Sequence, residues 1–304
     1  MSARIRLGEE VGAARADERP LVALETSVLG QGLPFPRNAE CRDLMDAAIR
    51  GAGAVPAWIG VAAGDVVVGL SEGDLAAFME PGRAEKVARR DLPAACARGG
   101  LGATTVSATI WAAARAGIHV TATGGIGGIH LGNRSDVSAD LLELARTPGL
   151  LVCSGPKSIV DPAATVERLE ELGVGLLGYR TDRLPHFVAT EAPIALEHRA
   201  DSPDEAAAAL TAALALQTGS SLVLCQPVPA ALALDRDEVA AATRRAEDRA
   251  ARQGVRGRDL TPFLLTALAE ETGGRSLEAN IGLLGSNAEL ASEVAVRTRT
   301  PIGS

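Results

Sequence analysis

Two lysines stand out in a chain whose other basic residues are all arginine. Lys86 and Lys157 are the only lysines among 30 Lys and Arg residues. Arginine stays protonated at ordinary pH, whereas lysine can lose its proton and act as a nucleophile. Either the two lysines remain on the surface by chance, or they do chemistry that a guanidinium cannot do.

Lys157 has the sequence surroundings of a nucleophilic amine. It follows a predicted buried strand at residues 150–153 and precedes a predicted helix at residues 162–172. Partial burial and the positive end of the helix dipole both favour the neutral form of an amine. A second cation nearby would favour that form further, and Lys86 is the only other lysine. We therefore predict that Lys157 acts as a nucleophile.

Lys86 belongs to a basic patch in an acidic chain. Residues 86–91 read Lys-Val-Ala-Arg-Arg-Asp, whereas the formal net charge is −8 and the isoelectric point is about 5.2. Such a patch can hold a phosphate, or it can be the solvated face of a helix. An acidic surface repels phosphate backbones, so we predict no nucleic-acid partner and a local cationic pocket for any phosphate-bearing ligand.

Carboxylates in two further loops could also take part in chemistry. Glu25 directly follows an apolar run at residues 21–24, where it can give or take a proton at a sheet edge, or cap a turn. Asp136 and Asp140 flank Ser138, and both would lie near one face if this stretch began a helix. Hard oxygen ligands suit Mg²⁺ or Mn²⁺, whereas Asp-x-Ser is also a common helix start.

The densest glycine run, residues 124–128, offers many backbone N–H groups to a phosphate or a closely packed ligand. His130 stands where GxGxxG requires its third glycine, and no GK[ST] ending follows. Dinucleotide and P-loop interpretations are therefore weak. A tight turn required by packing is the competing interpretation.

The elements that must position these residues alternate between apolar strands and helices. This alternation predicts an α/β fold with three α/β/α layers and a largely parallel, or mixed, central sheet. We predict one catalytic domain at residues 19–297, with flexible termini at 1–18 and 298–304. Predicted strands lie at 21–24, 55–61, 66–70, 120–123, 150–153, 174–179 and 222–224, and predicted helices at 38–50, 71–77, 103–116, 138–146, 162–172, from 203, and at 237–253, 262–272 and 288–296.

Ligands of such sheets bind beyond the carboxyl ends of the strands, so the loops after residues 24, 123 and 153 should build the site. The four cysteines are far apart and form no CxxC pair, which favours thiols in a reducing compartment. The first twenty residues lack an apolar signal core, and the uncharged stretch 206–234 contains glutamines and prolines. We predict a cytoplasmic protein with no membrane partner.

Eight short segments, taken together and in order, resemble the pseudouridine-5′-phosphate glycosidase family, also called indigoidine synthase A-like. The resemblance runs from about residue 20 to residue 297, and its specificity comes from the set rather than from any one segment. The segments are LETS (24–27), KVARRDLP (86–93), GATTV (102–106), TGGIGGIH (123–130), DVSAD (136–140), SGPKSI (154–159), GRDLTPFL (257–264) and SLEANI (276–281).

The resemblance implies reversible cleavage of the C–C glycosidic bond of pseudouridine 5′-phosphate to uracil and ribose 5-phosphate, by a homotrimer that uses Mn²⁺. By matching position, Glu25 resembles the proton donor and Lys157 the lysine that bonds to ribose C1′. Asp136 resembles the ligand of Mn²⁺, and Mg²⁺ or another divalent ion could take the place of Mn²⁺. The implied substrate contacts are Lys86, Val106, Thr123, His130, Ser138, Ala139, Asp140 and Asn280.

Three positions depart from the family pattern: Trp58, Leu131 and Gln226. Loss of an arginine at Leu131 could weaken phosphate affinity or alter the preferred substrate. Three alternatives therefore stay open. The chain could act on another C-linked or phosphorylated ribosyl compound in a pigment pathway, or bind a sugar phosphate without catalysis. It could also be a serine amidase, because Ser154 and Lys157 match SxxK, although the companion KTG and SDN motifs are absent.

Overall fold

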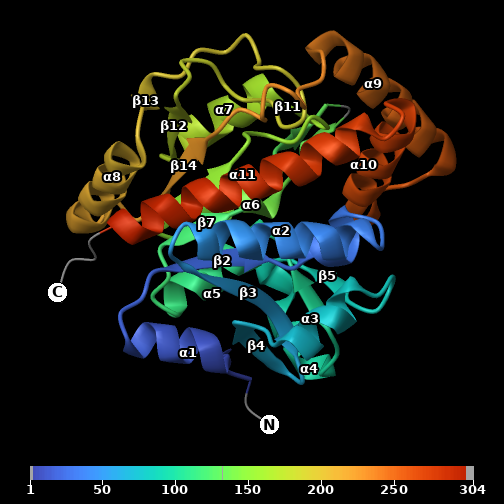
Figure 1. Ribbon diagram of the computed structural model, residues 1–304. Coiled ribbons are helices and arrows are strands. Elements are labelled where there is room, and N and C mark those ends of the chain that lie inside the picture. Colours follow the sequence, from blue (N-terminus) through green and yellow to red (C-terminus); the bar gives the residue numbers. More distant parts are fainter. Residues whose placement is uncertain (1–2, 132, 299–304) are drawn as a thin grey trace.

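The computed structural model describes residues 3–131 and 133–298. Within them, eleven strands form one sheet through the centre of the molecule, and helices cover both of its faces (Figure 1). The strand order is β1-β4-β3-β2-β7-β10-β14-β12-β13, and β6 joins at β3 and carries β5. The predicted α/β/α layering around a largely parallel sheet is confirmed.

Short strands and helices of very different length make up these layers. The main sheet contains β1 (Ile5–Leu7), β2 (Leu21–Glu25), β3 (Val55–Ala62), β4 (Asp65–Val68), β5 (Glu85–Val87), β6 (Gly102–Thr104), β7 (Val120–Ala122), β10 (Gly149–Cys153), β12 (Gly175–Tyr179), β13 (His198–Ala200) and β14 (Ser221–Cys225). A small second sheet contains β8 (Ile129–His130), β9 (Asn133–Val137) and β11 (Val160–Asp161). The helices are α1 (Glu9–Ala16), α2 (Arg37–Gly51), α3 (Glu72–Met79), α4 (Leu92–Arg98), α5 (Val106–Arg115), α6 (Ala139–Leu144), α7 (Pro162–Glu171), α8 (Pro203–Leu216), α9 (Arg236–Gln253), α10 (Leu260–Glu271) and α11 (Arg275–Arg297), with short helical turns η1 (Val28–Gly32), η2 (Arg89–Asp91) and η3 (Gly257–Asp259).

The centre of the main sheet is parallel and buried on both faces. β2, β7, β10, β14 and β12 run in one direction, and every residue of β10 is buried. Nearly continuous apolar runs are typical of strands that helices cover on both sides. The carboxyl ends of these strands lie at one edge, so the segments after β2, β7 and β10 meet there.

The sheet becomes mixed at β3. Both β4 and β6 run antiparallel to β3, while β1 and β5 extend them as parallel neighbours. In this register Lys86 of β5 lies opposite Ala103 of β6. The parallel pairing of β5 with β6 thus brings Lys86 into the sheet, from a segment for which the sequence predicted no strand.

Alternate strand residues face two different helix layers. In β10, Leu150 and Val152 belong to the core shared with α2, α8 and α11, whereas Leu151 and Cys153 belong to the core shared with α5, α6 and α7. This period of two follows from the pleat of the strand. The 23-residue helix α11 runs across the middle of the first layer (Figure 1). No helix in the described part of the chain is both long enough and apolar enough to cross a membrane.

A hairpin of α9 and α10 lies outside these two layers (Figure 1). Ala246 and Ala250 of α9 form a small apolar cluster with Leu264 and Ala267 of α10, and Ile159 from the loop after β10 joins it. Burial of these side chains holds the start of α10 beside that loop.

The prediction of a flexible segment at residues 1–18 is wrong for its described part. β1 pairs with β4, and α1 buries Val11 and Ala14. A three-residue strand and two small buried side chains leave too weak a pattern to find in the sequence. At the other end Thr298 caps α11, and residues 299–304 of the predicted flexible C-terminus lie outside the described residues.

The predicted helix at residues 103–116 is wrong in its first turn, because β6 occupies that stretch and α5 begins only at Val106. The Thr104 hydroxyl donates a hydrogen bond to the carbonyl of Ile59 at 2.6 Å, which ties β6 to β3. Thr105 then takes the extended conformation of a helix N-cap. Tertiary pairing here overrides the helix propensity of the alanine-rich run.

Asn287 of α11 joins the helix layer to the strand ends. Its side chain is fully buried, and Nδ2 donates to the carbonyl of Thr123 at 2.9 Å and to Ser154 Oγ at 3.1 Å. One amide therefore holds the ends of β7 and β10 at a fixed distance from the helix above them.

Replacing Asn287 by an apolar residue should destabilise this junction. Asn287→Leu leaves buried polar atoms at Thr123 and Ser154 without their partner, so we expect the free energy of unfolding to fall by about 1–3 kcal/mol. Urea denaturation measures this change. Glu289→Ala on an exposed position of the same helix is the control, with an expected change within about 0.5 kcal/mol. Equal stabilities of the two variants would contradict the prediction.

Candidate active site

A cavity of about 310 Å³ opens at the carboxyl edge of the sheet. Every residue that the sequence predicted for the site lines this cavity, although the residues come from many separate elements. They are Glu25, Lys86, Val106, Thr123, His130, Asp136, Ser138, Ala139, Asp140, Lys157 and Asn280. The fold therefore brings the predicted set together, and the chemical role of each member stays a prediction.

Glu25 provides a buried carboxylate at the end of β2. Ser27 Oγ donates a hydrogen bond to Glu25 Oε2 at 2.6 Å, and Thr123 Oγ1 donates one to Glu25 Oε1. Only 3% of the surface of Glu25 is exposed, and no described residue forms an ion pair with it. Two hydroxyls thus orient the carboxyl group without neutralising it, which suits a group that exchanges protons.

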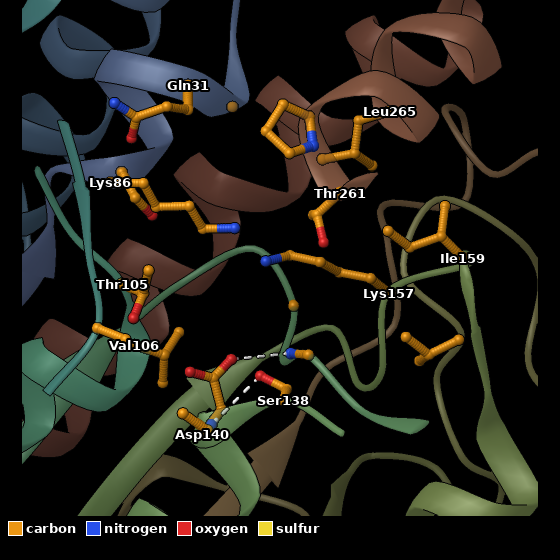
Figure 2. Close-up of a pocket in the computed structure, with 18 of the residues that line it drawn as sticks. Gln31, Lys86, Thr105, Val106, Ser138, Asp140, Lys157, Ile159, Thr261 and Leu265 are labelled. Carbon is orange, nitrogen blue, oxygen red and sulfur yellow. Dashed lines mark hydrogen bonds between the residues drawn. The ribbon is translucent and has the colours of Figure 1, made fainter. Parts of the chain in front are cut away.

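Asp140 ties together the loops that form the cavity wall. Its Oδ1 accepts a hydrogen bond from Ser107 N at 3.1 Å, and its Oδ2 accepts one from Gly127 N at 3.0 Å (Figure 2). Ser138 Oγ caps α6 by accepting from Asp140 N. Asp136 lies in β9, so the helix that would have placed both carboxylates near one face does not include it. Both oxygens of Asp140 are engaged by the backbone, which leaves Asp136 as the freer carboxylate.

The two lysines face each other across the cavity. Lys86 lies in β5 and Lys157 in the loop after β10, and Figure 2 shows their amine ends directed toward one another. Burial lowers the pKa of Lys86, and the charge of Lys157 lowers it further, whereas Asp140, Glu25 and Asp259 oppose the shift. The predicted second cation beside Lys157 is therefore present.

Backbone pairing holds the Lys157 loop against the glycine run. Ile126 N donates to the carbonyl of Gly155 at 3.1 Å, and Lys157 N donates to the carbonyl of Ile126 at 3.0 Å. Gly155 has φ +78°, and a Cβ there would lie 2.0 Å from the carbonyl oxygen of Pro185. Only glycine fits this left-handed, crowded position. The glycine run thus acts as a scaffold for Lys157.

His130 and Asp136 lie in the wall on the side of the small sheet. Burial lowers the pKa of His130, the charge of Asp136 opposes this shift, and Lys86 and Lys157 add to it. Across residues 3–131 and 133–298, no three His, Cys, Asp or Glu side chains gather as a metal-binding group. A divalent ion would therefore have Asp136 as its carboxylate, with water and substrate oxygens completing its shell. This donor set suits Mg²⁺ or Mn²⁺.

Sequence reasoning does not identify several other residues that line the cavity. Among them are Ser27, Gln31, Phe187 and Thr261. Ser27 and Thr261 fall within segments that carry the family resemblance, so the signal for them was available. Phe187 sits in a long loop with φ +57° and presses against Gly125. No local sequence pattern marks such a position.

The three departures from the family pattern lie outside the cavity lining. Trp58 packs in the core between the sheet and α2, and its indole donates to Asp46 Oδ1 at 2.8 Å. Gln226 Nε2 donates to Ser286 Oγ at 2.6 Å, and Leu131 is exposed. These side chains therefore do not shape the cavity wall.

The fold and site define a class of α/β protein in which an amine, a buried carboxylate and a second cation share a cavity at the sheet edge. The sequence profile of the family described as indigoidine synthase A like protein matches residues 10–297. The chain belongs to this family, which confirms the resemblance found in the motifs.

Curated relatives cover almost the whole chain. A pseudouridine-5′-phosphate glycosidase from Herpetosiphon aurantiacus is 47% identical over 295 residues, which span 96% of this chain and 97% of the relative. The protein of the same name from Escherichia coli K12 is 44% identical over 294 residues, which span 96% and 94%.

Solved structures show the same fold. The crystal structure of the prealnumycin C-glycosynthase AlnA in complex with ribulose 5-phosphate has a TM-score of 0.88 and 38% identity, and covers 98% of this chain and 97% of that chain. An indigoidine synthase A-like protein from Thermotoga maritima has a TM-score of 0.88 and 38% identity, with 97% and 96% coverage.

The proximity of the two amines predicts a measurable coupling. Because the chain has two lysines, labelling lysine with ¹³C at Cε gives two side-chain signals, which substitution assigns. We expect Lys86 to titrate below the ordinary lysine pKa of about 10.4. Lys157→Met should raise this midpoint by removing a nearby positive charge, whereas Arg249→Met, on α9, should leave it unchanged. An unchanged midpoint in Lys157→Met would contradict the coupling.

The same shift has a consequence for stability. A folded-state pKa of Lys86 below the unfolded value means that the unfolded chain binds this proton more tightly. The contribution of Lys86 to the free energy of unfolding therefore rises as pH increases between the two values.

Proposed function

We propose that the chain catalyses reversible cleavage of the C–C glycosidic bond of pseudouridine 5′-phosphate, which gives uracil and ribose 5-phosphate. The observation that carries the proposal is that buried Glu25 and the amine of Lys157 line one cavity, with Lys86 opposite. The names of the curated relatives, which are 43–47% identical, support the same reaction.

The leaving atom explains why a carboxylate and an amine are needed together. The base leaves through uracil C5, a carbon that must gain a proton before its bond to C1′ breaks. Two carboxylates acting on an oxygen leaving group would be a poor fit to this chemistry. A neutral amine can donate its lone pair to C1′ as the base departs, which Arg, Ser and Asp do less well.

The proposed steps use Glu25 and Lys157 in turn. Glu25 gives a proton to the ring oxygen of the ribose as its bond to C1′ breaks, and the Lys157 amine forms a bond to C1′. The Glu25 carboxylate then takes a proton from the new C1′–N ammonium, which restores the nitrogen lone pair, and gives it to uracil C5, so that the C1′–C5 bond can break. Its electron pair stays with uracil, while the nitrogen lone pair completes a lysine iminium at C1′. Water adds to this carbon, and ribose 5-phosphate leaves with regeneration of the amine.

The remaining wall residues provide binding and orientation. Lys86 and His130 lie on the cavity wall where a phosphate or sugar oxygen can accept hydrogen bonds from them. Asn280 offers an amide to the base or the sugar, and its Oδ1 would lie 3.1 Å from a Cβ on Gly124. A side chain larger than glycine at position 124 would therefore crowd Asn280.

We include Mn²⁺ in the proposal, with Mg²⁺ or another divalent ion as a substitute. Asp136 would hold the ion, which would supply positive charge to the substrate phosphate. Asp136→Asn should weaken Mn²⁺ binding at least about tenfold, because the single carboxylate ligand is lost. Calorimetry with Mn²⁺ and ribose 5-phosphate measures this, and Asp237→Asn, an exposed residue of α9, is the control. Equal Mn²⁺ affinity in both variants would exclude Asp136 as the ligand.

A homotrimeric assembly and a cytoplasmic location complete the proposal. The trimer is inferred from the family resemblance. The location is supported by four cysteines that are all buried and unpaired, as expected of a protein in a reducing compartment.

A second candidate function remains within the same chemistry. The structural likeness to a C-glycosynthase that binds ribulose 5-phosphate favours C–C bond formation between a sugar phosphate and a different carbon nucleophile. A sugar-phosphate binder without activity would need no reactive amine. The serine amidase alternative is unfavourable, because Ser154 is fully buried and does not line the cavity.

Trapping the proposed iminium tests the central step. Purified protein with Mn²⁺ and pseudouridine 5′-phosphate should release uracil, and borohydride should then leave a reduced pentose phosphate adduct on Lys157 alone. Lys157→Arg keeps the charge but cannot form the iminium, so we expect at least about a 10³-fold loss of kcat. Peptide mass mapping distinguishes Lys157 from Lys86. Full activity in Lys157→Arg, or an adduct elsewhere, would exclude the mechanism, and ribose 5-phosphate binding without uracil release would favour the binder.

A further inference from the structure

Thr261 enters the cavity from an element remote from the strand-end loops. It lies in the first turn of α10, and Gly257, Pro262 and Leu265 of the same segment line the cavity with it. The apolar cluster between α9, α10 and the loop after β10 holds this turn in place. The segment therefore forms a wall of the cavity that the parallel strands do not provide.

This wall faces both lysines. Figure 2 shows the Thr261 hydroxyl directed into the cavity, toward the side chain of Lys157. Asp259, two residues earlier, is close enough for its charge to act on Lys86. Two independent observations thus place the start of α10 against the reactive side of the cavity.

The hydroxyl of Thr261 is free to act there. The hydroxyl of Thr123, another threonine of the cavity, already donates a hydrogen bond to Glu25. Thr261 forms no side-chain hydrogen bond within residues 3–131 and 133–298. The following residue, Pro262, has no N–H, and the side chain does not cap the helix. A threonine hydroxyl can accept one hydrogen bond and donate another, and its branched Cβ restricts χ1.

We propose that Thr261 is a positioning residue for Lys157. Its hydroxyl accepts a hydrogen bond from the Lys157 amine and holds Nζ in line with C1′ of the sugar, while its own hydrogen points to a sugar oxygen. This role rests on the proposed function, because it assumes that the amine attacks C1′. Small displacements of a nucleophile cost large factors in rate, so a single hydroxyl in this place has a kinetic effect.

Three variants test the role. Thr261→Val keeps the shape and removes the hydroxyl, Thr261→Ser keeps the hydroxyl, and Thr266→Val makes the matched change on an exposed position of α10. We expect Thr261→Val to lower kcat for uracil release by about 10- to 100-fold with KM changed less than about threefold. The rate of borohydride trapping at Lys157 with ribose 5-phosphate should fall by a similar factor. Thr261→Ser should restore at least half of both rates, and Thr266→Val should match the unmodified protein.

The possible failures are distinguishable. If the unmodified protein neither releases uracil nor is trapped at Lys157, the proposed function fails before any variant is made. If it does both and Thr261→Val retains its kcat and trapping rate, the positioning role is wrong while the function stands. Equal losses in Thr261→Val and Thr261→Ser would also overturn the role. Were Thr261→Val not to fold, the pair Thr261→Ala and Thr261→Ser would decide by the same comparison.

Discussion

The confinement of two amines in one cavity is the constraint on which the rest of the site depends. Burial lowers the pKa of Lys86, and the charge of Lys157 across the cavity lowers it further. Acidic groups at Glu25, Asp140 and Asp259 offset part of the cost. Arginine could not occupy these positions in the same way, because a guanidinium has no accessible neutral form. The proposed function therefore accounts for lysine at these two positions in a chain whose other Lys and Arg residues are all arginine.

Holding this arrangement requires the strand ends to be joined from both sides. Asp140 links the glycine run to the start of α5, and Asn287 links the ends of β7 and β10 to α11. Each uses one buried polar side chain to satisfy backbone groups of two different segments. Because buried polar atoms are costly without partners, these bonds define where the loops sit. The loop of Lys157 is held in addition by backbone pairing with the glycine run.

The sequence predicted the strands that are buried on both faces. It predicted less well the segments whose conformation depends on the strand they pair with. The strands that become β2, β10 and β12 are nearly continuous apolar runs, and their pattern indicates a parallel sheet covered on both faces. Ala103 and Thr104 of β6 were predicted as helix because an alanine-rich run follows them, and only pairing with β3 and β5 makes this segment a strand. α1 was missed because it buries just two side chains.

Residue chemistry was determined by the sequence alone: a rare amine after a buried strand, a carboxylate at a strand end, and a segment order that identifies the family. The tertiary structure decided which groups meet. It placed Asp136 in β9 and Asp140 in the first turn of α6, where the Asp140 carboxylate accepts a hydrogen bond from Gly127 N. It also added Thr261 and Phe187, which approach from distant segments. Local patterns report what a residue can do, whereas the direction of its side chain depends on backbone paths that only long-range packing selects.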